Sequence, residues 1–333
     1  MHSLPFIWGG IIAFIIMMYV LLDGFDLGVG ILFPFTKNEY ERDIMMNSIA
    51  PVWDGNETWM VMGGASLYGA FPVVYSTLLP TLYLPLMLML GALIYRGIAF
   101  EFRPKADRSK FLWNISFTLG SVVAAFCQGV VLGTFVKGYP IQDGILVIGN
   151  YQWLTPFSFM TGIGVVIGYA LLGATWMLKK SDGELHVRMR RYAKTLMILL
   201  LLFFIGVSIW TPFIDPRLMM RWFSMPNMLY LAPLPIVSMG MFLWLWYSLK
   251  QDYHNQPFSL TITLFTLAYF GFCISIWPYI IPPYLTLWDA AAPATSQLFC
   301  LIGMIILMPI LLGYTYYSYF VFRGKVKPGE THY

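Results

Sequence analysis

Four carboxylates lie at the neighbouring ends of two apolar segments, in strings that otherwise resemble lipid-buried helices. The strings are LLDGFDLGVG, residues 21–30, and PVWDGNETW, residues 51–59, and they contain Asp23, Asp26, Asp54 and Glu57. Within each pair the acids are three residues apart, which places both on one face of a helix. An ionised side chain at the centre of a membrane helix costs about 2.5–3.5 kcal/mol on insertion scales, and less near the interface. We therefore expect these groups to face the protein interior and to pair with one another.

Proton transfer is the chemistry that such a cluster could perform. Buried carboxylates near a water-accessible face can pick up protons and pass them inward, and Arg96 is a nearby cation that can hold some of them ionised. The alternative is an interfacial ion-pair network that fixes the register of the helices. We favour proton uptake for Asp23 and Asp54, which are set deeper in apolar and aromatic sequence. Asp26 and Glu101 also fit the interfacial network.

Groups that could hold a cofactor are few. Trp53 stands beside Asp54, where it could stack on the ring of a quinone or lipid, although a place in the aromatic belt of a membrane protein is the alternative. A haem iron inside a membrane usually needs a histidine, but the four histidines fall in predicted loops or tails: His2, His186, His254 and His332. The three cysteines lie singly in apolar segments. We expect this chain to ligate neither haem nor metal by itself.

The elements that must position these residues are membrane helices. Of the 333 residues 59% are apolar and 11% are charged, whereas soluble domains carry about 25% charged residues. This composition excludes a soluble protein. Apolar runs of about 20 residues cross a bilayer as helices, and such runs predict an all-α integral membrane protein with nine transmembrane helices, near residues 6–33, 52–77, 80–102, 112–136, 153–178, 194–213, 229–249, 258–281 and 295–322.

The basic residues predict the orientation of these helices. When residues at helix ends are counted with the adjoining loops, 17 of the 20 Lys and Arg residues fall after helices 1, 3, 5 and 7 or in the C-terminal tail. Loops rich in Lys and Arg face the cytoplasm. The N-terminus is therefore predicted outside and the C-terminus inside, and the carboxylates and Arg96 lie toward the cytoplasmic side.

We expect residues 1–333 to form a single membrane domain. Residues 1–136 would be a first four-helix bundle that carries the acidic cluster, residues 153–281 a second bundle, and residues 295–322 the extra ninth helix. The string YVLLDG, residues 19–24, resembles YALLGA, residues 169–174. This similarity suggests two parallel repeats, but six apolar residues can also match by chance, so the duplication stays open.

Four strings together resemble subunit II of the cytochrome bd-type quinol oxidases, including their cyanide-insensitive relatives. They are LDGFDLGVG at 22–30, RDIMMNSIAPVWDGNETW at 42–59, RGIAFEFR at 96–103 and GYALLGATW at 168–176. The resemblance implies a complex of the bacterial cytoplasmic (inner) membrane that oxidises ubiquinol or another quinol and reduces oxygen to water. It also implies that protons for this reaction come from the cytoplasm.

The resemblance further implies how the work is divided. Two b-type haems, one d-type haem and the quinol site are expected on subunit I, with which this chain would form a heterodimer. Lipid, quinone and a small single-helix accessory subunit are further candidate partners, and no nucleic acid is expected. The acidic motif positions of the family correspond to Asp23, Asp54 and Asp26, whereas many relatives have another residue in place of Glu57.

The expected function is therefore that of a non-catalytic subunit of a quinol oxidase, which contributes assembly and a cytoplasmic proton path. Asp23, Asp54, Glu57, Asp26, Arg96 and Glu101 are the candidate residues of that path. Two alternatives remain from the residues alone. One is a proton-coupled transporter, although this sequence lacks the paired broken helices that such proteins usually show in their two halves. The other is a pure assembly scaffold.

Overall fold

The computed structural model describes residues 3–142, 145–146, 149 and 151–326; His2 and His332 lie outside this part of the chain. The described chain is almost entirely helical. Its helices are α1 Leu4–Leu32, α2 Glu39–Asn47, α3 Trp53–Ala70, α4 Pro72–Thr81, α5 Tyr83–Phe102, α6 Lys110–Lys137, α7 Pro156–Lys180, α8 Gly183–Ile214, α9 Pro216–Phe223, α10 Asn227–Leu231, α11 Pro233–Gln251, α12 Gln256–Ile276 and α13 Ala294–Val321, with a 3₁₀ turn at Phe33–Phe35. Two antiparallel hairpins, β1 Ile141–Gln142 with β2 Ile145–Leu146 and β3 Tyr279–Ile281 with β4 Leu285–Thr286, complete the fold.

Eight helical segments of the described chain are long and apolar enough to span a membrane. They are Leu4–Phe35, Tyr83–Phe102, Lys110–Lys137, Pro156–Lys180, Gly183–Ile214, Asn227–Gln251, Gln256–Ile276 and Ala294–Val321. An all-helical, multi-pass membrane protein, as predicted, is therefore the architecture. The count of nine crossings and their direction remain predictions.

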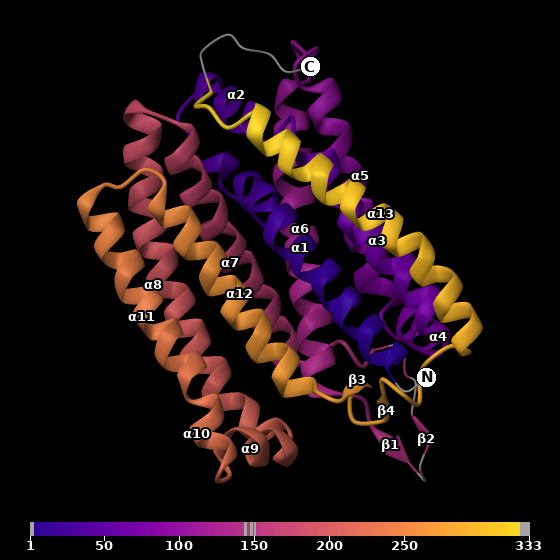
Figure 1. Ribbon diagram of the computed structural model, residues 1–333. Coiled ribbons are helices and arrows are strands. Elements are labelled where there is room, and N and C mark those ends of the chain that lie inside the picture. The colour runs from indigo at the N-terminus through magenta and orange to yellow at the C-terminus, as the bar shows by residue number, and fades with distance from the viewer. Residues whose placement is uncertain (1–2, 143–144, 147–148, 150, 327–333) are drawn as a thin grey trace.

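The difference in number arises in the segment that was predicted to cross at residues 52–77. There the chain forms α3 and α4, which are broken between Phe71 and Pro72. Proline lacks the N–H that a continuous helix needs, and it disfavours helical geometry in the residue before it. Polar residues in the first turns of α3 lower its hydropathy further. Even so, α3 runs beside α13, as Figure 1 shows.

One predicted boundary was wrong by several turns. The helix expected to begin near residue 194 begins at Gly183, directly after Asp182, and its first turns carry mainly polar and basic residues. A hydropathy profile detects only the part of a helix that lipid would cover, so it does not detect the turns that extend into water. As a consequence His186 lies within α8 and not in a loop.

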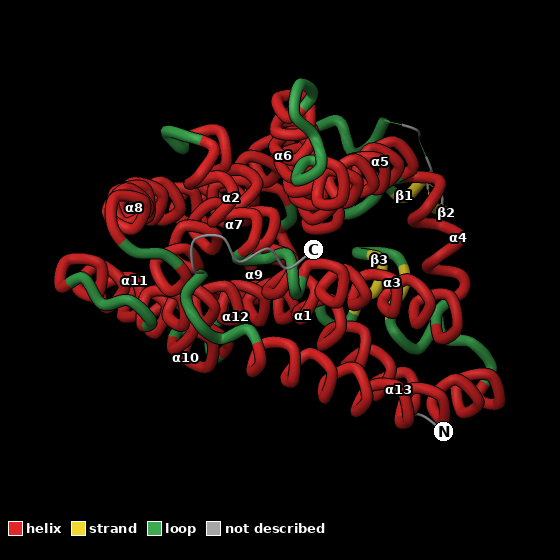
Figure 2. Tube along the Cα trace, turned by 90° about the horizontal axis from the view of Figure 1, so that it is seen from above, coloured by secondary structure: helices red, strands yellow, loops and turns green. Residues whose placement is uncertain are grey.

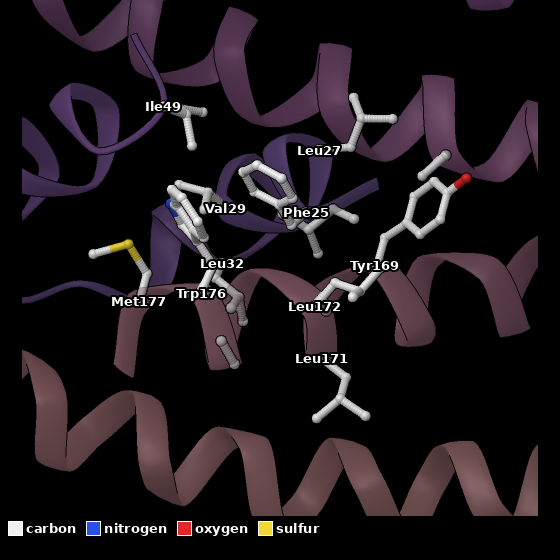
Figure 3. Close-up of a cluster of buried hydrophobic side chains, with 14 of the residues drawn as sticks. Phe25, Leu27, Val29, Leu32, Ile49, Tyr169, Leu171, Leu172, Trp176 and Met177 are labelled. Atoms are coloured by element: carbon white, nitrogen blue, oxygen red, sulfur yellow. The ribbon is translucent and has the colours of Figure 1, made fainter. Parts of the chain in front are cut away.

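Helix α1 is the centre of the molecule. It packs against α3, α6, α7 and α12, and the end-on view in Figure 2 shows it between α3 and α12. The C-terminal half of α1 joins a large core in which the ring of Phe25 stacks on that of Trp176, with centroids 4.4 Å apart (Figure 3). Because α1 packs against α7, the two predicted four-helix groups share a central contact. Their division into two bundles remains a prediction.

A glycine pair permits this contact between α1 and α7. A Cβ atom built on Gly28 would lie 1.8 Å from the carbonyl oxygen of Tyr169, and one built on Gly173 would lie 2.2 Å from the carbonyl carbon of Gly28. No side chain fits between backbones at that separation, which is the usual reason for small residues at crossings of membrane helices. The glycine-rich string that contains Asp23 and Asp26 is thereby held against α7.

Candidate functional site

Arg96 joins three helices through one nitrogen atom. Its Nη1 donates hydrogen bonds to Asp23 Oδ1 on α1 at 3.2 Å and to Glu57 Oε1 on α3 at 2.7 Å, while Arg96 itself projects from α5. The side chains of Arg96 and Asp23 are 0% and 1% exposed, and that of Glu57 is 19% exposed. The guanidinium also lies over the ring of Phe100, 5.7 Å from its centroid. The site is therefore buried at one end and reaches the surface at Glu57.

Close packing of α6 against α5 sets the position of Arg96. A Cβ atom at Gly120 of α6 would lie 2.6 Å from the carbonyl oxygen of Ala92 and 2.9 Å from Cβ of Arg96. Glycine is thus required for α6 to lie against the helix turn that carries the arginine.

Asp26 forms a second arm of the site. It is fully buried, and its Oδ2 accepts a hydrogen bond of 2.7 Å from Nδ2 of Asn56 on α3. Asn56 Nδ2 also lies 2.8 Å from the hydroxyl of Tyr319 on α13, which donates to Asn56 Oδ1 at 3.0 Å. Through these bonds α13 is connected to the acidic site.

The charges within the cluster do not balance if every carboxyl group is ionised. Asp23, Asp26 and Glu57 face the single guanidinium of Arg96, and charge repulsion in a medium of low dielectric constant favours the binding of protons by such a group. One oxygen of Asp23, one of Asp26, and Nε and Nη2 of Arg96 are buried without a partner in the described chain. These atoms leave room in the hydrogen-bond network for a proton to be gained or lost. The arrangement is suited to proton uptake and release.

The burial of two predicted residues is the reverse of what we expected. Asp54 was expected to be deep and Asp26 nearer the interface, but Asp54 is exposed on the surface of this chain and Asp26 is completely buried. The reason is which face of α3 packs against α1. Asn56 takes the position that faces α1, so Asp54, two residues earlier, points away from it.

Glu101 and Trp53 lie at the edge of the site. Glu101 is exposed and pairs with Lys105 at 3.5 Å, whereas Arg103 pairs with Glu39 and with Asp43 of α2. The indole of Trp53 stacks on Phe100, with ring centroids 4.7 Å apart and an angle of 6° between the planes. Of the six ionisable groups that we expected to converge, Asp23, Asp26, Glu57 and Arg96 form the buried cluster.

Two residues of the site were missed in the sequence. Asn56 lies between the two acids of WDGNETW, where an amide within a membrane-buried segment is itself a signal. Tyr319 gave no such signal, because it lies 263 residues away and is one of several tyrosines in α13.

The buried histidine does not fit a haem or metal site. His186 is 4% exposed, and both of its ring nitrogens are occupied, Nδ1 with the carbonyl oxygen of Leu178 at 3.2 Å and Nε2 with Asp252 at 3.1 Å. Within the described residues there is no group of three or more His, Cys, Asp or Glu side chains that could hold a metal ion. These residues therefore give no support for a metal centre in this chain.

A buried carboxylate–arginine cluster between apolar spans defines an integral membrane protein with a polar centre. The chain belongs to the cytochrome bd terminal oxidase subunit II family, whose model matches residues 4–322. It is therefore a subunit of a terminal quinol oxidase, a haem-dependent and quinol-using complex. The resemblance predicted from the four strings is confirmed.

Individual relatives match over almost the whole chain. Cytochrome bd-I ubiquinol oxidase subunit 2 of Escherichia coli strain K12 is 29% identical, covering 97% of this chain and 95% of the relative. Cytochrome bd ubiquinol oxidase subunit 2 of Bacillus subtilis strain 168 is 28% identical, covering 99% of each. The solved structure of bd oxidase from Geobacillus thermodenitrificans contains a chain with a TM-score of 0.78 and 18% identity, covering 96% of this chain and 98% of that one. At that identity the structural match concerns the fold.

Proposed function

We propose that this chain supplies a cytoplasmic proton path to the oxidase and that Asp23, Glu57 and Arg96 form its buried part. The observation that carries this proposal is the shared contact of Arg96 Nη1 with Asp23 and Glu57. Reduction of oxygen to water consumes protons, so the complex needs a polar route through its apolar spans. A cluster of carboxylates that is open at one end and buried at the other provides such a route.

The order of the groups follows from their exposure. Asp54 is exposed and lies one helical turn before Glu57 on α3, so it is the first carboxylate that a proton from the surface would meet. Glu57 is partly exposed and Asp23 is buried, and Arg96 bonds to both. The guanidinium keeps its own proton and stabilises whichever neighbouring carboxylate is ionised. A proton that arrives at Glu57 lowers the negative charge around Arg96 and can then be exchanged with Asp23.

Subunit I is the expected heterodimer partner, and we place it against α3. Five exposed residues fall on one stripe of this helix at helical spacing: Asp54, Thr58, Val61, Ala65 and Tyr68. A carboxylate would be costly against lipid tails, and small residues favour close contact with another helix. With α3 counted as a crossing, the chain has nine spans, an outer N-terminus and a cytoplasmic C-terminus, in agreement with the distribution of Lys and Arg. Asp54 would then lie at the boundary between the subunits.

We further propose that the two b-type haems, the d-type haem and the quinol site lie on subunit I in the bacterial cytoplasmic membrane. The occupied ring nitrogens of His186 support this division. The relatives from Escherichia coli and Bacillus subtilis are described as ubiquinol oxidase subunits, which favours ubiquinol or a similar quinol as the substrate. A lipid or quinone ring at the face of Trp53 opposite Phe100, and a single-helix accessory subunit, complete the proposed contacts.

Oxygen consumption by the assembled complex tests the proton path. In Asp23→Asn we expect turnover per haem to fall about 100-fold, the lower end of the range lost with a proton-transfer group, while the visible spectrum keeps all haem bands. Unchanged turnover per haem would refute the path. Loss of haem with unchanged turnover of the remaining loaded complex would favour the assembly scaffold instead.

A further inference from the structure

A second series of hydrogen-bonded polar side chains, from α6 and α7, approaches the turn of α1 that precedes Asp23. Gln128 of α6 donates from Nε2 to the hydroxyl of Tyr19 on α1 at 2.8 Å, and the hydroxyl of Tyr169 on α7 donates to Gln128 Oε1 at 2.7 Å. The two tyrosines are 7% and 2% exposed. Tyr19 lies one helical turn before Asp23 on the same face of α1, and one oxygen of Asp23 is buried without a hydrogen-bond partner in the described chain. None of these three residues belongs to the proton path proposed above.

The donors in this chain all point the same way. The hydroxyl of Tyr169 donates a hydrogen bond to the amide oxygen of Gln128, and the amide nitrogen of Gln128 donates a hydrogen bond to the oxygen of Tyr19. The oxygen of Tyr19 is thus an acceptor on one side, so its single proton remains available for the unpartnered buried oxygen of Asp23. An amide does not release its proton as a hydroxyl does, so this series of hydrogen bonds orients the Tyr19 hydroxyl and does not conduct protons.

A comparison of Tyr169 on α7 with Tyr19 on α1 shows why these hydrogen bonds can support an acid on α1 only. Figure 3 shows its hydroxyl directed away from the leucines that follow it on α7. In the string similar to YVLLDG, Tyr169 corresponds to Tyr19 and Gly173 corresponds to Asp23. A Cβ at Gly173 would meet the backbone of Gly28 at 2.2 Å, so no carboxylate fits there. Two tyrosines therefore flank one amide, but only α1 carries an acid.

We propose that Tyr19 is a positioning residue for Asp23, held in place by Gln128 and Tyr169, and that it stabilises the ionised Asp23 as the acceptor of protons. This inference rests on the proposed proton path and adds to it a series of hydrogen-bond donors from α6 and α7. A hydroxyl donor to a carboxylate favours the charged form. Cooperative hydrogen bonding through Gln128 strengthens that donor.

Other groups also face Asp23 and contribute to its charge state. Arg96 from α5 donates to Asp23, and Glu57 from α3 accepts from the same guanidinium nitrogen. Asp26, on the same helix, adds further negative charge near the site. Tyr319 on α13 interacts with the same carboxylates. Removal of Tyr19 leaves these groups in place, so its effect can be measured against a constant background.

The test is the pH dependence of oxygen consumption by the assembled oxidase with Tyr19→Phe. Loss of a donor to the anion lets Asp23 hold its proton to higher pH, so the acidic limb of the activity profile should move upward by about one pH unit. Gln128→Met should give a smaller shift in the same direction, and Tyr169→Phe the smallest. Tyr139→Phe is the matched control, because the Tyr139 hydroxyl is buried without a hydrogen-bond partner in the described chain.

A double variant separates this inference from the proton path. In the background of Asp23→Asn, Tyr19→Phe should cause no further shift of the profile, because the group that it stabilises is gone. An unchanged profile in both Tyr19→Phe and Gln128→Met, with Asp23→Asn still impaired, would overturn the positioning role and leave the path intact. An equal shift in Tyr139→Phe would also overturn it. If Tyr19→Phe does not assemble, the shift in Gln128→Met decides.

Discussion

Arg96 and Glu57 form the shortest ion pair of the buried cluster, with Nη1 2.7 Å from Oε1, and the same nitrogen reaches Asp23 at 3.2 Å. One fully buried cation thus holds together carboxylates from two other helices. Removal of one partner from a buried ion pair typically costs about 3–5 kcal/mol, because the remaining charge stays in a medium of low dielectric constant. The cluster therefore stabilises the packing of these three helices and is also a candidate proton site.

We expect Arg96→Met to lower the thermal stability of the purified complex and the amount that assembles. The variant leaves Asp23, Glu57 and Asp26 facing one another with no cation, which is most costly where all three are ionised. Glu57→Gln in the same chain should restore part of the stability, because it removes one of the repelling charges. Arg323→Met, at an exposed position after α13, is the control and should melt as the unchanged complex does. Equal melting temperatures for Arg96→Met and Arg323→Met would contradict the structural role.

The contact between α1 and α7 makes a separate prediction. Gly173→Ala should reduce stability, since its Cβ would collide with the backbone of Gly28 at 2.2 Å; overpacking of this kind costs about 1–3 kcal/mol or more. Gly206→Ala in α8 is the matched control, because its Cβ meets nothing within 4 Å. There alanine should be neutral or stabilising, as expected from helix propensity. Thermal unfolding of both variants checks the result, and an unaffected Gly173→Ala would show that the helices do not cross as described.

The end of the described chain should respond to pH. A hydrogen bond from Lys325 lowers the pKa of the exposed Asp182 carboxyl group below its ordinary value. A lowered pKa means that this attachment is present above the ordinary pKa of aspartate and is lost as the pH falls through the lowered value. Protection from hydrogen exchange at residues 322–326, measured relative to the intrinsic exchange rate at each pH, should therefore decrease at acidic pH.

Asp182→Asn should produce the same loss of protection at neutral pH. Neither change should remove protection completely, because Lys180 Nζ also donates to the carbonyl oxygens of Phe322 and Gly324. Asp107→Asn, in the exposed turn after α5, serves as the control. Protection that is independent of both pH and Asp182 would rule out the attachment.

The sequence predicted the membrane class of the protein and the neighbourhood of Asp23, Asp26, Glu57 and Arg96. Long apolar runs leave few alternatives to helices, and charged groups within them have to find one another. The face of each residue on α3 could not be predicted in the same way. Asn56 and Asp54 are two residues apart, and only the packing of α3 on α1 decides which of them is buried.

Contacts that are distant in sequence were also beyond prediction. The bond between Asn56 and Tyr319 depends on where α13 returns to the bundle, and no local pattern encodes that position. The start of α8 at Gly183 was missed because a helix that continues into water carries no hydropathy signal. By contrast, the family could be identified because its strings combine acids, glycines and an arginine at fixed spacings.

The proposed proton path depends above all on Asp23, which would pass protons toward the oxygen chemistry of the complex. The most direct test is the rate of proton uptake from the cytoplasmic side during a single turnover, followed with a pH-sensitive dye in oxidase reconstituted into vesicles. We predict that Asp23→Asn slows this uptake about 100-fold, the lower end of the range expected for loss of a proton-transfer group, while the haem spectrum is unchanged. Uptake at the unmodified rate in a fully haem-loaded Asp23→Asn complex would contradict the claim.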